Sequence, residues 1–183
     1  FPHVSWFKMN QNNHISDQLL YLIKGNVNIN SKVKTEKKKV FSGSIPKIVK
    51  NKNYIVIQLS SGDSADCYKN WDFKKWNKLL EKLTRDFSSI YFVFLGGSAE
   101  RKALNQISLN KNMIDLIGKT NIKKAFKIIE NAKFYIGLDS GLMHLSVYLN
   151  LPTISIFGPS CITAWGYEKK HKKSNHYIIT SNS

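Results

Sequence analysis

The chain has 183 residues, enough for one domain with a full hydrophobic core, and 42% of them are hydrophobic, as in an ordinary globular protein. No apolar run approaches the roughly 20 residues of a membrane-spanning helix, and Cys67 and Cys161 fit neither a metal-binding spacing nor a disulfide framework. The composition therefore excludes a helical membrane protein and a disulfide scaffold, and a reducing cytoplasm is the expected location.

The formal net charge of +16 leaves two explanations open. Sequence-specific nucleic-acid sites rely on arginine forks, and only Arg85 and Arg101 are arginines, so we expect no specific nucleic-acid partner. A scattered lysine surface suits an anionic membrane leaflet, a phosphorylated acceptor or nucleic acid bound without sequence preference. The alternative is a compositional bias toward Lys, Asn and Ile that only keeps the surface soluble.

The first 46 residues differ in pattern from the rest. They begin at Phe1 without an initiator methionine and lack the basic and apolar regions of a signal peptide, so we expect a fragment of a longer protein. One helix is predicted at residues 15–24, where it ends before Gly25. Residues 26–46 are polar and rich in lysine, which is typical of a linker or of an exposed strand pair.

From residue 54 onward, strand-like and helix-like patterns alternate. Continuous apolar runs predict strands at residues 54–59, 90–95, 113–117, 133–138, 153–157 and 176–180. Apolar residues at helical spacing predict helices at 71–87, 99–108, 122–131 and 142–149. This alternation predicts an α/β fold, a Rossmann-like parallel sheet with helices on both faces.

The helix at 122–131 is expected to begin with Thr120 as its N-cap. The side chains that we expect to face the core are Ile122, Ala125, Phe126, Ile128 and Ile129.

Four turns rich in glycine and serine follow predicted strands, at residues 60–62, 96–98, 137–141 and 158–160. In an open parallel sheet, ligands bind at the carboxyl ends of the strands. Such turns offer backbone N–H groups to phosphates without obstruction by side chains. Together they predict a cleft for a nucleotide or a nucleotide-sugar.

The third turn carries the most chemistry. Ser140 is a good N-cap for the following helix, and Gly141 lets a ligand approach the backbone closely. The free N–H groups and the dipole of a helix start form an anion site, and Asp139 and His144 stand beside it. The alternative is an ordinary capped helix in which His144 is packed or solvated.

This turn and the next one together resemble a known family. Residues 139–144 read Asp-Ser-Gly-Leu-Met-His, and Pro152 then leads a strand that ends in Phe-Gly-Pro-Ser at residues 157–160. In this order and separation, both motifs resemble glycosyltransferase family 9, which includes the lipopolysaccharide heptosyltransferases. The resemblance extends from about Ile48 to the end of the chain and, more weakly, over the first 25 residues.

The resemblance implies the C-terminal part of a two-domain GT-B glycosyltransferase. Residues 1–46 would be a remnant of the N-terminal domain plus a linker, and residues 47–183 the nucleotide-sugar-binding domain. The implied reaction is an inverting, metal-independent transfer of a sugar, from ADP-heptose or a similar donor, to a lipopolysaccharide core or other glycolipid acceptor, with no cofactor. The family's general base lies in the N-terminal domain, so we expect no catalytic residue in this chain and no activity from it alone. Such an enzyme would work in the cytoplasm, in peripheral contact with the anionic inner membrane.

The resemblance also assigns roles in donor binding. Ser60 and Ser61 would contact the pyrophosphate, with Lys69 adding positive charge, while Glu100 would accept the two ribose hydroxyls and Thr120 would contact the nucleobase side through its backbone. The full expected set is Ser60, Ser61, Lys69, Glu100, Thr120, Asp139, Ser140, Gly141 and His144. Lys69 as a solvated loop residue remains an alternative.

Two other functions stay open. The same fold could take another nucleotide-sugar donor, or the chain could be a non-catalytic basic module that binds nucleic acid or an anionic surface.

Overall fold

The computed structural model describes residues 44–62, 68–167 and 176–180. The chain divides into two compact units, Phe1–Lys38 with Cys161–Gly166, and Lys39–Ser160 with Tyr167–Ser183. The described part of the first unit contains helix α6 (Ile162–Trp165), which the sequence analysis did not predict. The helix predicted at residues 15–24 and most of the predicted linker lie outside the described residues.

The second unit is built on a parallel sheet with the strand order β3-β2-β1-β4-β5-β6. Each neighbouring pair of strands is parallel. The strands are β1 (Tyr54–Ile57), β2 (Tyr91–Phe94), β3 (Met113–Asp115), β4 (Phe134–Leu138), β5 (Thr153–Phe157) and β6 (His176–Thr180). The chain runs outward from β1 to β3 and then returns past β1 to β4. The topological switch point therefore lies between β1 and β4.

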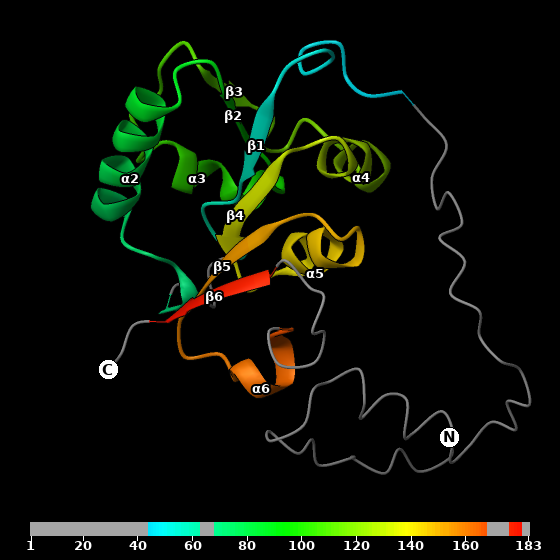
Figure 1. Ribbon diagram of the computed structural model, residues 1–183. Helices are drawn as coiled ribbons and strands as arrows, with labels where there is room; N and C mark the ends of the chain where they lie inside the picture. The colour runs from blue at the N-terminus through cyan, green and yellow to red at the C-terminus, as the bar shows by residue number, and fades with distance from the viewer. Residues whose placement is uncertain (1–43, 63–67, 168–175, 181–183) are drawn as a thin grey trace, which may run out of the picture. The chain divides into compact units, whose positions relative to one another are not determined.

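Helices cover both faces of this sheet (Figure 1). Helix α2 (Phe73–Asp86) lies on one face with the short 3₁₀ turn η2 (Ser98–Glu100) and helix α3 (Arg101–Leu104). Helices α4 (Ile122–Glu130) and α5 (Gly141–Tyr148) lie on the other face. Connections between parallel strands are right-handed, so reversing the direction of travel along the sheet moves the connecting helices to the opposite face. The predicted fold class is confirmed.

Helix α2 is anchored at its start and along its length. The Asp72 carboxylate accepts the backbone N–H groups of Lys74 and Lys75, at 2.7 and 3.1 Å, and so caps the helix. Trp76 and Leu80 are buried in one core cluster with residues of β1 and β2. The turn after β1 and the start of α2 are thereby held at the same edge of the sheet.

Two details of α4 differ from the sequence prediction. Asn121, rather than Thr120, is the N-cap, because its side chain accepts the N–H of Lys124 at 3.0 Å. Ile122 was expected to face the core but is 61% exposed. It is the first helical residue, and one turn separates it from Ala125, the first residue of the buried face.

The helix predicted at 99–108 is shorter than expected, because α3 ends at Leu104. The chain beyond it is bound to α2 instead of continuing the helix. The Asn77 side chain donates to the carbonyl of Gln106 at 2.7 Å and accepts the N–H of Ser108 at 2.8 Å. These side-chain hydrogen bonds to the backbone take the place of the bonds that a longer helix would form.

Gly137 in β4 gives a test of packing at the switch point. A Cβ at this position would lie 2.5 Å from the Tyr135 hydroxyl and 2.9 Å from the Gln58 Cβ. We expect Gly137→Ala to lower the free energy of unfolding by about 1–3 kcal/mol, measured by denaturant titration. The added methyl group would force the packed side chains of Tyr135 and Gln58 to move. The control is Gly141→Ala, since a Cβ there meets nothing within 4 Å. Equal midpoints for the two variants would contradict the packing described here.

Candidate functional site

The four predicted turns lie where the sequence placed them, at the carboxyl ends of β1, β2, β4 and β5. All these strands are parallel, so the turns share one edge of the sheet. Three of them follow the adjacent strands β2, β1 and β4, and the switch point lies among these three. This is the edge at which an open α/β sheet binds its ligands.

The start of α5 forms an anion-binding geometry at this edge. Ser140 is the N-cap, as predicted, and its hydroxyl accepts the N–H of Met143 at 3.3 Å. The first N–H groups of a helix have no acceptor within the helix, and the space beside Gly141 is open. A phosphate can therefore approach the backbone here.

Three charged or ionisable side chains meet beside this helix start. Asp139 lies at the end of β4, with its carboxylate 3.9 Å from the Lys69 ammonium nitrogen and 3.9 Å from His144 Nε2. The Asp139 residue is only 9% exposed. The structure thus brings together five of the predicted residues, the three just named with Ser140 and Gly141.

His144 also contacts a residue that the sequence analysis missed. Its Nδ1 lies 2.9 Å from the Tyr167 hydroxyl, and the two rings meet edge to face with centroids 5.6 Å apart. Burial lowers the pKa of His144, and the negative charge of Asp139 opposes this shift in part. The neutral imidazole is therefore favoured, chiefly by desolvation.

A buried polar network lies beneath the turns. The side-chain oxygen of Gln58 accepts the hydroxyls of Tyr135 and Ser140. The Gln58 amide donates to Glu100 Oε1 at 3.4 Å, and the N–H of Gly97 donates to the same oxygen at 3.2 Å. The network joins the turns after β1, β2 and β4. Gln58 and Tyr135 lie in segments that the sequence predicts as apolar strands. The one sequence signal for their role is a polar group within an otherwise apolar run.

Glu100 is placed under the turn after β2. The residue is 4% exposed, and a Cβ at Gly96 would meet its carboxylate at 2.5 Å. Burial raises the pKa of Glu100 to about 7, although hydrogen bonds from Gln58, Gly97 and Ser60 lower it in part. The contact with ribose hydroxyls that the resemblance assigns to Glu100 stays a prediction.

The remaining predicted residues lie around this network. Ser60 is buried beside Glu100, and the N–H of Ser61 donates to the Asn70 side chain at 3.3 Å, which ties the turn after β1 to the segment before α2. Thr120 lies beyond β3, two strands away from β1.

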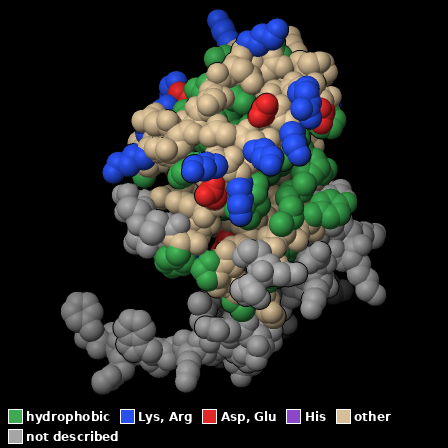
Figure 2. Space-filling view, turned by 90° about the vertical axis from the view of Figure 1, so that its left-hand side faces the viewer, with side chains coloured by type: hydrophobic (Ala, Val, Ile, Leu, Met, Phe, Trp, Pro, Cys, Tyr) green, Lys and Arg blue, Asp and Glu red, His purple; other side chains and the backbone are tan. Residues whose placement is uncertain are grey.

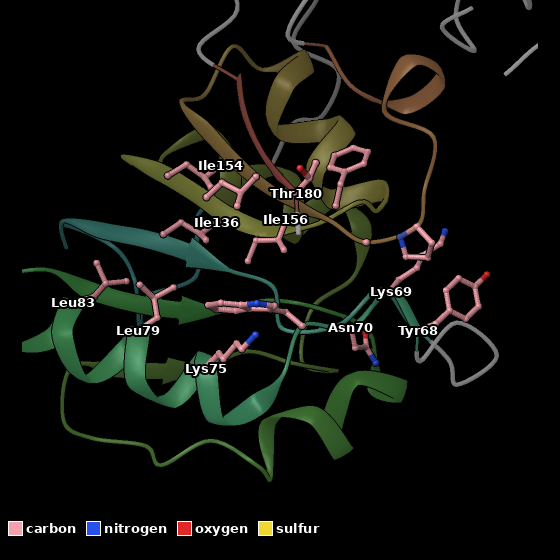
Figure 3. A pocket seen from close by; sticks show the side chains of 15 residues that line it. Tyr68, Lys69, Asn70, Lys75, Leu79, Leu83, Ile136, Ile154, Ile156 and Thr180 are labelled. Atoms are coloured by element: carbon pink, nitrogen blue, oxygen red, sulfur yellow. The ribbon is translucent and has the colours of Figure 1, made fainter. Parts of the chain in front are cut away.

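A cavity of about 760 Å³ lies on the α2 side of β4, β5 and β6 (Figure 3). Its walls are mostly apolar, because isoleucines from the sheet face leucines from α2. Figure 3 labels five of these apolar residues, Ile136, Ile154, Ile156, Leu79 and Leu83. Of the predicted donor residues, only Lys69 lines it. The cavity therefore lies mainly between the sheet and α2, and it reaches the carboxyl edge at Lys69, Asn70 and the turn at residues 158–160.

Within the described ranges, no group of three His, Cys, Asp or Glu residues could hold a metal ion. The helices of the same ranges include none that combines the length and the apolar character needed to cross a membrane.

Comparison with known proteins gives a family. A model described as glycosyltransferase family 9 (heptosyltransferase) matches residues 15–182. Lipooligosaccharide heptosyltransferase 2 of Haemophilus influenzae is 35% identical over 100 residues, which cover 50% of this chain and 28% of the relative. The protein of the same name from Campylobacter jejuni serotype O:6 is 31% identical over 123 residues, 64% of this chain and 38% of the relative. The chain thus spans 28–38% of the length of these relatives.

Solved structures agree on the fold. The ADP-heptose lipopolysaccharide heptosyltransferase II of Escherichia coli has a TM-score of 0.58 at 23% identity, covering 71% of this chain and 39% of that one. An E. coli heptosyltransferase solved with ADP has a TM-score of 0.57 at 22% identity, with 74% and 39% covered. The sheet is therefore of the Rossmann-like kind found in GT-B glycosyltransferases, as predicted.

The buried Glu100 predicts a pH dependence of stability. Its pKa is raised from 4.5 to about 7, so between these values the folded protein binds the proton more tightly than the unfolded chain. The free energy of unfolding should then fall as pH rises across this window. The Glu100→Gln variant lacks this titrating group, so its free energy of unfolding should decrease less between about pH 4 and pH 8 than that of the wild type. The difference should be on the order of 3 kcal/mol, measured by denaturant titration.

The control is Glu81→Gln, at an exposed position of α2. It should leave the pH profile of the wild type unchanged. A Glu100→Gln profile that runs parallel to the wild type would show that Glu100 titrates normally.

Proposed function

The chain belongs to glycosyltransferase family 9 (heptosyltransferase), and on this basis we propose that it is the donor-binding half of a glycosyltransferase. Its donor would be a nucleotide-sugar, ADP-heptose or a close analogue, and its acceptor a lipopolysaccharide core or related glycolipid. Residues 47–183 would be the C-terminal nucleotide-sugar-binding domain. Residues 1–46 would be the end of the N-terminal domain and the linker.

The cluster at the start of α5 is the observation that carries this proposal. A diphosphate placed against Gly141 would meet the positive end of the helix dipole. Lys69 and His144, which the Asp139 carboxylate holds at 3.9 Å each, lie beside that position. These groups would stabilise the negative charge that develops on the leaving diphosphate as the glycosidic bond breaks.

The other donor contacts would spread along the same edge. We assign the pyrophosphate to Ser60 and Ser61, the ribose hydroxyls to Glu100 and the nucleobase side to Thr120. The nucleotide would then extend from the switch point across β1 and β2 toward β3, which is the order in which these residues lie along the sheet.

The proposed transfer is an inverting displacement at the anomeric carbon without metal or cofactor. Positive charge at the diphosphate would come from Lys69 and the α5 start. The acceptor hydroxyl must lose a proton to a general base, which we assign to the N-terminal domain. This chain alone would bind the donor without transferring its sugar.

Binding of ADP tests this function. We expect a dissociation constant of roughly 0.1–10 mM in NMR titration, weak because one wall of the cleft belongs to another domain. The amide resonances of Ser140, Gly141 and His144 should shift, and those of Tyr148 at the far end of α5 should not. The shifts should be the same with EDTA present. Shifts confined to the apolar cavity beside α2 would place the ligand elsewhere and overturn the proposal.

A second element of the proposal is peripheral contact with an anionic membrane, and a basic surface favours it. Figure 2 shows lysine and arginine side chains on the face of the molecule that contains α2. The exposed basic residues of that helix are Lys74, Lys75, Lys78, Lys82 and Arg85. Basic segments near anionic lipid gain about 1 kcal/mol per Lys or Arg. The lysine cluster at residues 32–39 lies outside the described residues.

Sedimentation with vesicles tests this contact. Binding should increase with the fraction of anionic lipid and disappear between about 50 and 300 mM salt, because screening shortens the range of the attraction. Replacing Lys74, Lys78 and Lys82 of α2 by Gln should weaken it more than replacing Lys123 and Lys124 of α4. Tighter binding to duplex DNA than to such vesicles would instead support a nucleic-acid-binding module.

A further inference from the structure

Tyr167 lies against His144, although 23 residues separate them in the sequence. The hydroxyl of Tyr167 is 2.9 Å from His144 Nδ1, and the rings cross at 75°. The opposite ring nitrogen, Nε2, is on the side of the Asp139 carboxylate, at 3.9 Å. The imidazole therefore stands between a phenol and the end of β4.

Tyr167 is itself supported by the sheet. The centroid of its ring lies 5.8 Å from the ring centroid of His176, the first residue of β6. His176 is 3% exposed, and its Nε2 is 2.7 Å from the hydroxyl of Ser155 in β5. A row of side chains thus connects the buried part of β5 to the imidazole at the α5 start.

The protonation states follow from this geometry. Burial, and then the charge of Asp139, raise the pKa of the Tyr167 hydroxyl, which therefore keeps its proton. A neutral imidazole has one N–H donor and one acceptor nitrogen. A lone pair at Nε2 would face the Asp139 carboxylate, whereas an N–H there is attracted to it. Nδ1 is then the acceptor, and the Tyr167 hydroxyl donates to it.

We propose that Tyr167 is a positioning residue that holds His144 in the tautomer with hydrogen on Nε2, the nitrogen that lies on the side of Asp139, next to the α5 start where the diphosphate would bind. The proposal rests on the proposed function, because it needs an anion at the α5 start. Tyr167 acts through His144 and does not touch the ligand. Without the phenol, only the Asp139 carboxylate would favour hydrogen on Nε2, so the other tautomer, which does not donate toward the phosphate, would gain population.

The nitrogen-15 resonances of the imidazole test the tautomer directly. In the wild type, His144 Nε2 should have the shift of a protonated nitrogen and Nδ1 that of an unprotonated one, with the signals assigned by their loss in His144→Ala. Tyr167→Phe keeps the aromatic ring and removes the donor, so both nitrogens should move toward averaged values. ADP affinity should fall about fivefold, a loss within the usual range for one hydrogen bond.

A double-mutant cycle separates positioning from simple packing. In a His144→Ala background, Tyr167→Phe should cause no further loss of ADP affinity, because its effect passes through the imidazole. Tyr148→Phe, at a 59% exposed position of α5, should change neither the nitrogen shifts nor the affinity. Additive losses in the cycle would overturn the proposal.

The wild-type spectrum also decides the proposal without any variant. A protonated Nδ1 on His144 would overturn it, whether or not Tyr167→Phe folds. Absence of ADP binding to the wild type would instead count against the proposed function, and the nitrogen shifts would still report the tautomer.

Discussion

The hydrogen bonds of Gln58 hold the carboxyl edge of the sheet together. This side chain accepts from Tyr135 and Ser140 and donates to Glu100, so it joins three turns that are far apart in the sequence. Gln58 is 3% exposed, and a partner left unsatisfied at such depth would cost about 1–3 kcal/mol. This carboxamide thus adds side-chain hydrogen bonds between the turns to the backbone pairing of β1 with β2 and β4.

The charged cluster depends in turn on the α5 start. The Ser140 hydroxyl accepts the N–H of Met143 and donates to Gln58, so the same oxygen caps the helix and ties it to β1. Asp139 directly precedes Ser140. Its carboxylate lies 3.9 Å from the Lys69 ammonium nitrogen and 3.9 Å from His144 Nε2. Contacts within the chain thus fix the positions of these groups, and fixed charges and dipoles stabilise a developing negative charge most effectively.

The parts that the sequence predicted are those that depend on local pattern. Strands β5 and β6 have the predicted bounds, and Ser140 caps α5 as expected, since a serine before a helical run is a local signal. Asn121 is the cap in place of Thr120 because the helix begins at Ile122, directly after Asn121, and asparagine is also the better N-cap residue of the two. Tyr167 and Gln58 could not be assigned, because their partners are fixed only when distant strands come together. The apolar cavity beside α2 could not be predicted for the same reason, because its lining comes from separate strands and from α2.

The topology fits the proposed division of labour, in which this chain binds the donor and another domain activates the acceptor. Ligands of an open parallel sheet lie outside the carboxyl ends of the strands, so the sheet supplies one wall of the cleft. That wall carries groups suited to a leaving diphosphate: a helix start, Lys69 and a neutral His144. In the proposed inverting displacement, the acceptor hydroxyl attacks opposite to the leaving group, so its activating base would lie on the far side of the anomeric carbon. In the proposed function this second wall is the N-terminal domain, and the chain itself spans 28–38% of the length of its relatives.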